Sequence, residues 1–77
     1  MSEYYIIAQV WNRRHRKYES KILFETQNDQ RAKDRFSKMN ATIDTPILEL
    51  YVVSEDYNTR LERKVCLERD FVERLEG

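Results

Sequence analysis

Glycine is nearly absent from this sequence of 77 residues, and the one that it has, Gly77, stands at the last position. Loops that bind phosphate groups through their backbone, in P-loop proteins and in dinucleotide-binding folds, need several glycines because the chain must approach the ligand closely. The sequence therefore excludes both kinds of nucleotide site.

Cysteine and histidine occur once each, as Cys66 and His15. A single cysteine cannot form an internal disulfide, and one Cys with one His cannot build a zinc site without carboxylates. His15 lies among four cations in an exposed loop, which is a poor setting for a catalytic base. Cys66, between Val65 and Leu67, is typical of a small half-buried hydrophobic residue. We therefore expect a non-enzymatic protein with no catalytic residue, no metal and no cofactor.

Long apolar runs are also missing, and the N-terminus lacks the basic-then-apolar layout of a signal peptide. We expect a cytoplasmic protein, of the producing or host cell, with no membrane contact. The length predicts a single domain, residues 1–77, with a thin core that a partner or a second copy would extend.

Charge is plentiful but uneven. Charged residues make up 36% of the chain and the formal net charge is zero, yet residues 1–38 hold nine Lys/Arg against five Asp/Glu, and residues 39–77 hold five against nine. The total therefore says nothing about nucleic acid, and only a local cluster of cations can indicate it.

The first half of the chain predicts a β-hairpin. Residues 4–11 alternate two sets of side chains that are both largely apolar, and residues 17–24 return after a loop, Asn12 to Arg16. A register with Trp11 opposite Lys17 places large residues opposite large ones and small opposite small. We expect Asn12 to take the left-handed conformation in the loop. The predicted inner pairs are Val10–Tyr18, Ala8–Ser20, Ile6–Ile22 and Tyr4–Phe24.

The rest of the chain predicts a helix and a second hairpin. Thr26 or Asn28 can cap a helix that carries an apolar stripe of Ala32, Phe36 and Met39 and ends near Ala41. In residues 47–53, Leu48, Leu50 and Val52 form one alternate set of side chains, which predicts a strand. A turn at Tyr57-Asn58 would lead into a fourth strand that ends at about Arg69, with Leu50 opposite Val65 and Arg63 facing inward.

These elements give an α+β fold of order β-β-α-β-β: an antiparallel four-stranded sheet with one helix packed on one face, followed by a short helical tail over residues 70–75. The alternative is a single helix over residues 59–76, whose composition favours helix.

The second face of the sheet is a candidate binding surface, because the helix covers only one face. Aromatic residues beside arginines are typical of the energetic centres of protein interfaces. The alternatives are that the tail covers this face, or that a homodimer closes it. The predicted members of the face are Tyr5, Ile7, Trp11, Leu23, Ile47, Tyr51 and Val53.

The loop between the first two strands is a second candidate. Arg13, Arg14, Arg16 and Lys17 give four cations in five residues beside Trp11. They can lie on a phosphate backbone while the aromatic ring stacks on a base. Alternatively, charge keeps the hairpin tip soluble and Lys17 covers the face of Trp11.

The layout of a short chain with hairpin, helix, second hairpin and dense alternating charge resembles small proteins encoded by bacteriophages. Among them are anti-CRISPR proteins, which block a host nuclease complex by occluding a surface. The resemblance spans the whole chain but carries no individual functional residue. It implies a protein partner and an inhibitory role, and a small nucleic-acid-binding protein that uses the loop 13–17 is the alternative.

Overall fold

The computed structural model describes residues 2–66, which form four strands and one helix in the predicted order. Residues 58–65 are a strand, so the alternative of one helix over 59–76 is wrong for this part. The predicted tail over residues 70–75 lies outside the described residues. The elements are β1 (Glu3–Asn12), β2 (Lys17–Thr26), α1 (Asp29–Ser37), β3 (Ile47–Val53) and β4 (Asn58–Val65).

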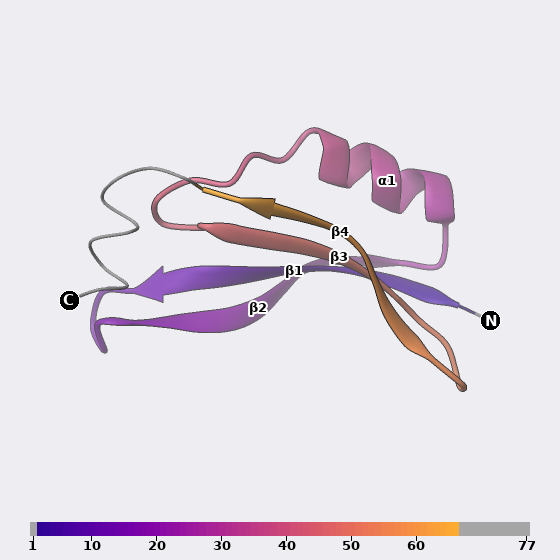
Figure 1. Ribbon diagram of the computed structural model, residues 1–77, viewed down its shortest axis with the longest axis horizontal. Coiled ribbons are helices and arrows are strands. Elements are labelled where there is room, and N and C mark those ends of the chain that lie inside the picture. Colours follow the sequence, from indigo (N-terminus) through magenta and orange to yellow (C-terminus); the bar gives the residue numbers. More distant parts are fainter. Residues whose placement is uncertain (1, 67–77) are drawn as a thin grey trace.

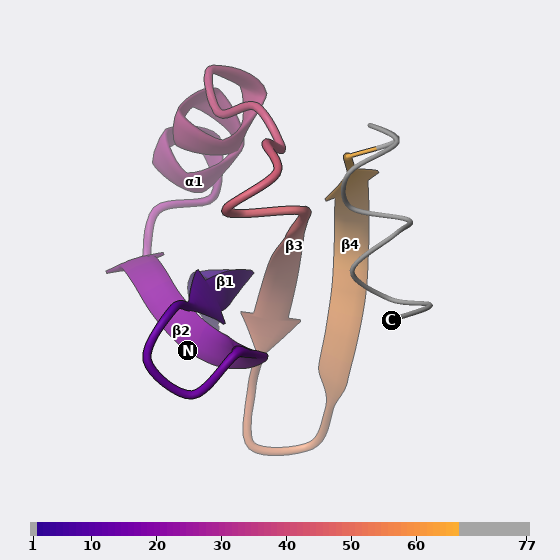
Figure 2. The same cartoon turned by 90° about the vertical axis from the view of Figure 1, so that its left-hand side faces the viewer.

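The four strands form one antiparallel sheet in the order β2-β1-β3-β4, with α1 on one face (Figures 1 and 2). The helix contacts β1, β2 and β3. We call the face that it covers the inner face and the opposite one the outer face. The predicted α+β class, with one helix on one face of an antiparallel sheet, is confirmed.

The core lies between α1 and the two central strands. Phe36 of the helix is fully buried and meets a layer of alternating strand residues. Alternation places every second residue of a strand on the same face, which is why β1 and β3 each contribute a regular row. The buried cluster consists of Ile6, Ala8, Ala32, Phe36, Leu48 and Leu50.

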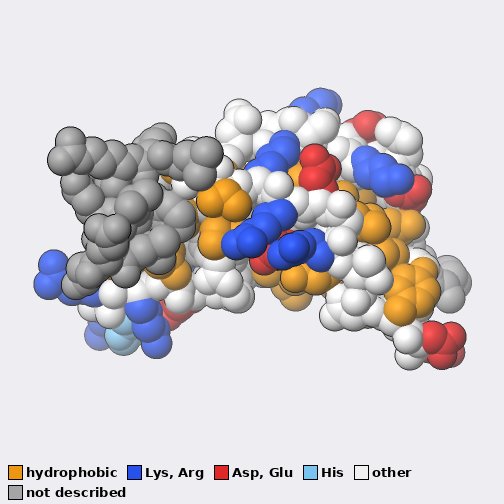
Figure 3. Space-filling model, in the orientation of Figure 1, with side chains coloured by type: hydrophobic (Ala, Val, Ile, Leu, Met, Phe, Trp, Pro, Cys, Tyr) orange, Lys and Arg blue, Asp and Glu red, His pale blue; other side chains and the backbone are white. Residues whose placement is uncertain are grey.

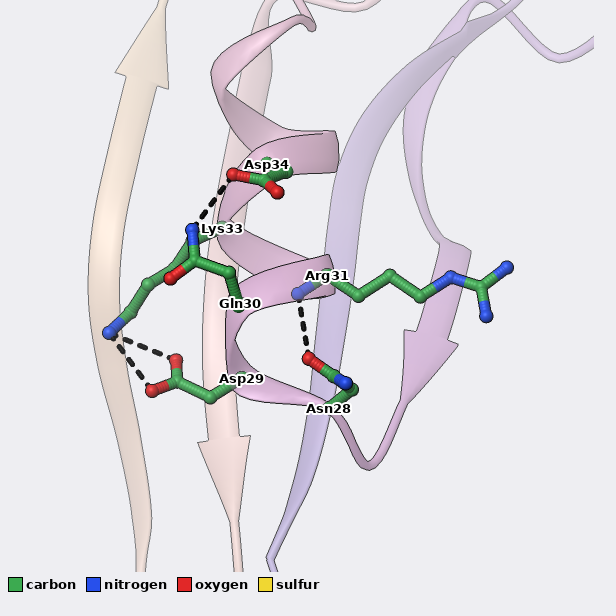
Figure 4. A network of polar contacts seen from close by, with 6 residues as sticks. All are labelled: Asn28, Asp29, Gln30, Arg31, Lys33 and Asp34. Carbon is green, nitrogen blue, oxygen red and sulfur yellow. Dashed lines mark hydrogen bonds and ion pairs between the residues drawn. The ribbon is translucent and has the colours of Figure 1, made fainter.

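The helix begins where its capping side chain predicts. Asn28 is the N-cap, and its Oδ1 accepts a hydrogen bond of 2.9 Å from the backbone N–H of Arg31 (Figure 4). Asp29 lies in the first turn, where a carboxylate suits the helix dipole, and pairs with Lys33 at 2.9 Å. The helix ends at Ser37 and not near Ala41, because the next backbone N–H groups bond three residues back instead of four.

A lysine from β4 closes the end of the helix. The Lys64 Nζ donates hydrogen bonds to the carbonyl oxygens of Phe36, at 2.7 Å, and Met39, at 2.8 Å. The same ammonium lies 4.7 Å from the centre of the Phe36 ring. The last carbonyls of a helix have no partner within it and carry partial negative charge, so a cation is the natural group to satisfy them.

The register of the first hairpin differs from the prediction by one or two residues. Trp11 lies opposite Tyr18, and Ile6 opposite Phe24. The pairing shifts between Ile6 and Ile7, so Leu23 has no partner and forms a β-bulge. Beyond the bulge the alternation of β2 is inverted: Ile22 lies opposite Ile7 on the outer face, whereas the prediction set it inward.

The second hairpin has the same irregularity. Its pairing shifts between Leu50 and Tyr51, which leaves Leu61 of β4 as the bulged residue. Leu50 faces Glu62 instead of Val65, and Arg63 lies opposite Glu49 on the outer face, so its predicted inward position is wrong. Because Ile6 and Leu50 are paired, the two bulges lie at the same level of the sheet, one in each outermost strand.

Candidate binding surface

The tip of the first hairpin is built around Asn12. Its Oδ1 accepts hydrogen bonds from the backbone N–H groups of Arg14, at 3.0 Å, and His15, at 3.1 Å. Arg16, with φ of 53°, takes the left-handed conformation that we expected at Asn12. Asparagine suits both the left-handed conformation and the first position of a turn, where its side chain accepts hydrogen bonds from the backbone. Asn12 takes the second role, so the prediction was wrong.

The Asn12 side chain should therefore stabilise the hairpin tip. We expect Asn12→Ala to lower the free energy of unfolding by about 1 kcal/mol, because two backbone N–H groups lose their acceptor. Chemical denaturation measures this change, and amide hydrogen exchange at Arg14 and His15 should become faster. Asn12→Asp keeps an acceptor oxygen and is the control. Equal losses in both variants would contradict the role of the acceptor.

The cations predicted at the tip are all exposed. Arg13, Arg14, Arg16 and Lys17 project from the turn, and Figure 3 shows blue side chains gathered around the single histidine there. Arg13 lies 3.8 Å from the Asp44 carboxylate, in the loop before β3. A pair this exposed contributes little stability, so the tip remains a positively charged surface.

Trp11 is positioned by its neighbours on the sheet. Its ring meets that of Tyr18 edge to face, with centroids 4.7 Å apart and planes at 61°. Its backbone N–H donates to the Asp44 carbonyl at 2.9 Å. The corrected register places Tyr18 opposite Trp11, whereas Lys17 lies opposite Asn12. The alternative interpretation, in which Lys17 covers the face of Trp11, is therefore wrong, and an aromatic pair takes its place.

The outer face carries a group of apolar and aromatic side chains from β1, β2 and β3. Tyr5 lies opposite Tyr51 across the two central strands, and Ile7 lies opposite Ile22. Tyr5, Ile7 and Tyr51 are half-buried, and Ile22 is 60% exposed. We call these four residues the apolar cluster. Among residues 2–66, no helix lies over it, since α1 packs against the opposite face (Figure 2).

Charged groups border the apolar cluster and fix its two phenol groups. The Tyr5 hydroxyl donates to a Glu3 carboxylate oxygen, and this bond, with smaller contributions from desolvation and nearby carboxylates, raises the pKa of Tyr5. The Tyr51 hydroxyl donates to Glu49 Oε2 at 3.2 Å, and Arg60 pairs with the same oxygen at 3.1 Å. An apolar centre with a polar rim is the usual anatomy of a protein interface.

The predicted site residues therefore form two groups. Tyr5, Ile7 and Tyr51 come together on the outer face, while Trp11 and the cations lie at the tip. Leu23, expected on the outer face, is the bulged residue. The sequence did not predict Ile22 in this cluster, because the bulge moves its side chain from the inner face to the outer face. No residue type in β2 indicates where the bulge occurs. The alternative in which the tail covers this face concerns residues outside the described range.

Residues 2–66 contain no group of three or more metal-ligating side chains and no helix with the length and apolar character that crossing a bilayer requires. Comparisons with protein-family models, with curated proteins and with solved structures give no match. The functional reading therefore depends on the surface itself.

Proposed function

We propose that this protein is a non-enzymatic binding module that docks onto another protein through the apolar cluster. The observation that supports the proposal is Ile22, a large aliphatic side chain left 60% exposed on the outer face of β2, opposite Ile7 of the central strand β1. Complete burial of a fully exposed isoleucine is worth about 1.5–3 kcal/mol, and a partner that covers the exposed 60% of Ile22 gains part of this. Tyr5 and Tyr51 add aromatic area of the kind enriched at interface centres.

The layout shared with small phage proteins supports a specific use of this docking. A rigid sheet face on a chain of 77 residues can occlude a surface on a larger assembly without chemistry of its own. We propose that the protein acts as an inhibitor of a host protein complex, in the manner of anti-CRISPR proteins.

The test uses a variant that damages the cluster and leaves the fold intact. Ile22→Glu places a charge at an exposed position, where substitutions change stability little. Tagged wild-type protein and the variant are used to isolate partners from host cells. The captured protein is then purified, and binding is remeasured with both. We expect affinity to fall at least tenfold for Ile22→Glu, as expected when about 1.4 kcal/mol of interface energy is lost.

The matched control is Leu61→Glu, because Leu61 is also exposed, at 45%, in the other outermost strand. It should bind like wild type. Hydrogen exchange of the purified complex should show protection in β1 and β3 at the cluster. Equal binding by wild type and Ile22→Glu would contradict the proposal. A mass in solution of twice 9.4 kDa, lost in Ile22→Glu, would assign the cluster to a second copy instead.

A further inference from the structure

A second surface, on the inner face, concentrates positive charge along β2. Beyond the bulge, Lys21 lies opposite Ala8 and Lys17 lies opposite Asn12, so both point to the side that α1 occupies. Both are exposed, which shows that the helix does not cover this part of the strand. The inverted alternation after the bulge is what brings the two lysines to the helix side.

Two arginines of α1 continue the same surface. The guanidinium carbons of Arg31 and Arg35 lie 5.9 and 5.3 Å from the centre of the Phe24 ring, on β2. Figure 4 shows Arg31 extending from the helix toward β2, whereas Lys33 extends the opposite way. The aromatic ring restrains both arginines beside the strand, so less conformational freedom is lost when they bind a ligand.

We call Arg14, Arg16, Lys17, Lys21, Arg31 and Arg35 the basic strip. Within residues 2–66, none of its six members forms an ion pair. One carboxylate, Glu19, shares the inner side of β2 between Lys17 and Lys21, opposite Val10. Glu19 offsets only part of this charge, so the strip keeps a local excess of positive charge even though the whole chain is neutral.

We propose that the basic strip binds the phosphate backbone of a nucleic acid, a function separate from the protein docking proposed for the outer face. From Lys17 to Phe24 the strand extends about 23 Å. This is enough to follow several phosphates, which recur about every 3.4 Å of helix axis on each strand of a duplex. Four of the six cations are arginines, whose planar fork fits phosphate and stacks on bases. These properties favour nucleic acid over an acidic protein segment.

The test is the salt dependence of binding to labelled oligonucleotides, measured by fluorescence anisotropy. An oligothymidylate and a duplex, each of about 20 nucleotides per strand, distinguish single from double strands, with salt varied from about 25 to 200 mM. For wild type we expect the logarithm of the association constant to fall linearly with the logarithm of salt concentration. The slope should be about −3 to −5 if four to six phosphates are neutralised.

The variant Arg31→Gln with Arg35→Gln removes two of these contacts. Its slope should become less steep by about 1.4–1.8, and its affinity at low salt should fall at least tenfold. Arg60→Gln with Arg63→Gln makes the same change in net charge on the outer face of β4 and should bind like wild type. Lys21→Gln, at an exposed position of β2, should reduce the slope by about 0.7–0.9 with the fold unchanged.

Three results would overturn the proposal. The first is no binding of either oligonucleotide at the lowest salt. The second is an equal loss in the strip variants and the Arg60/Arg63 control, which would mean that net charge alone matters. The third is competition by polyglutamate as effective as by DNA of equal charge, which would assign the strip to an acidic protein. None of these results bears on Ile22→Glu, so the two proposals stand or fall separately.

Discussion

Replacing Phe36 with alanine is expected to lower the free energy of unfolding by about 3–5 kcal/mol, because the ring is fully buried against the sheet. A domain of this size has a total stability of about 4–12 kcal/mol, so the substitution removes a large part of it. The Lys64 ammonium lies 4.7 Å from the centre of the same ring, so the substitution also removes this cation–π contact.

Urea denaturation followed by circular dichroism measures the effect. Leu61→Ala is the control, since Leu61 is 45% exposed and should change stability by less than about 1 kcal/mol. A loss below about 1.5 kcal/mol for Phe36→Ala would mean that the helix does not depend on this ring for its position.

Replacing Lys64 with methionine is expected to cost about 2–3 kcal/mol. Methionine keeps most of the apolar stem, but the carbonyl oxygens of Phe36 and Met39 lose a charged donor. These two bonds also join β4 to the end of α1. The backbones of these two elements do not otherwise come close to each other. We therefore expect the last turn of the helix to exchange its amide hydrogens faster in the variant.

Arg63→Met is the matched control, because Arg63 is adjacent in the chain but points to the outer face. It should change stability by less than about 0.5 kcal/mol. Equal losses in the two variants would show that the charge pattern of β4, and not the two carbonyl bonds, is responsible.

Much of the fold follows from local patterns in the sequence. The strand over Ile47–Val53 was predicted residue by residue, because Leu48, Leu50 and Val52 alternate with more polar neighbours. The helix start followed from Asn28, whose side chain supplies an acceptor for an otherwise unpaired N–H. Such signals need only nearby residues, so a single sequence contains them.

The registers were wrong because each depends on a bulge. Leu23 and Leu61 look like ordinary strand residues, and matching large with large across the hairpin assumes unbroken alternation. The error carried over to the candidate surface: Ile22 was placed inward and Arg63 inward, although both lie on the outer face. Tyr5, Ile7 and Tyr51 were placed on the outer face because they lie on the central strands, where alternation is regular.

The long-range contacts had no signal in the sequence at all. Nothing in a strand-like run indicates that Lys64 reaches across to the end of a helix. Likewise, the sequence predicts Arg31 and Arg35 as ordinary exposed residues of a helix. Only the structure shows that both lie over the Phe24 ring. Both features join residues from separate elements, so they exist only in the folded chain.

The paired bulges at Leu23 and Leu61 bear on how copies of this protein can meet. A bulge bends and twists its strand, so neither outermost strand offers a straight, unbroken ladder on which a neighbour's strand could add. Lateral growth into ribbons or fibrils is thereby discouraged at both sides at once. We therefore expect one extra leucine in each outermost strand to disfavour open-ended polymerisation, even though the apolar cluster lies on the same sheet.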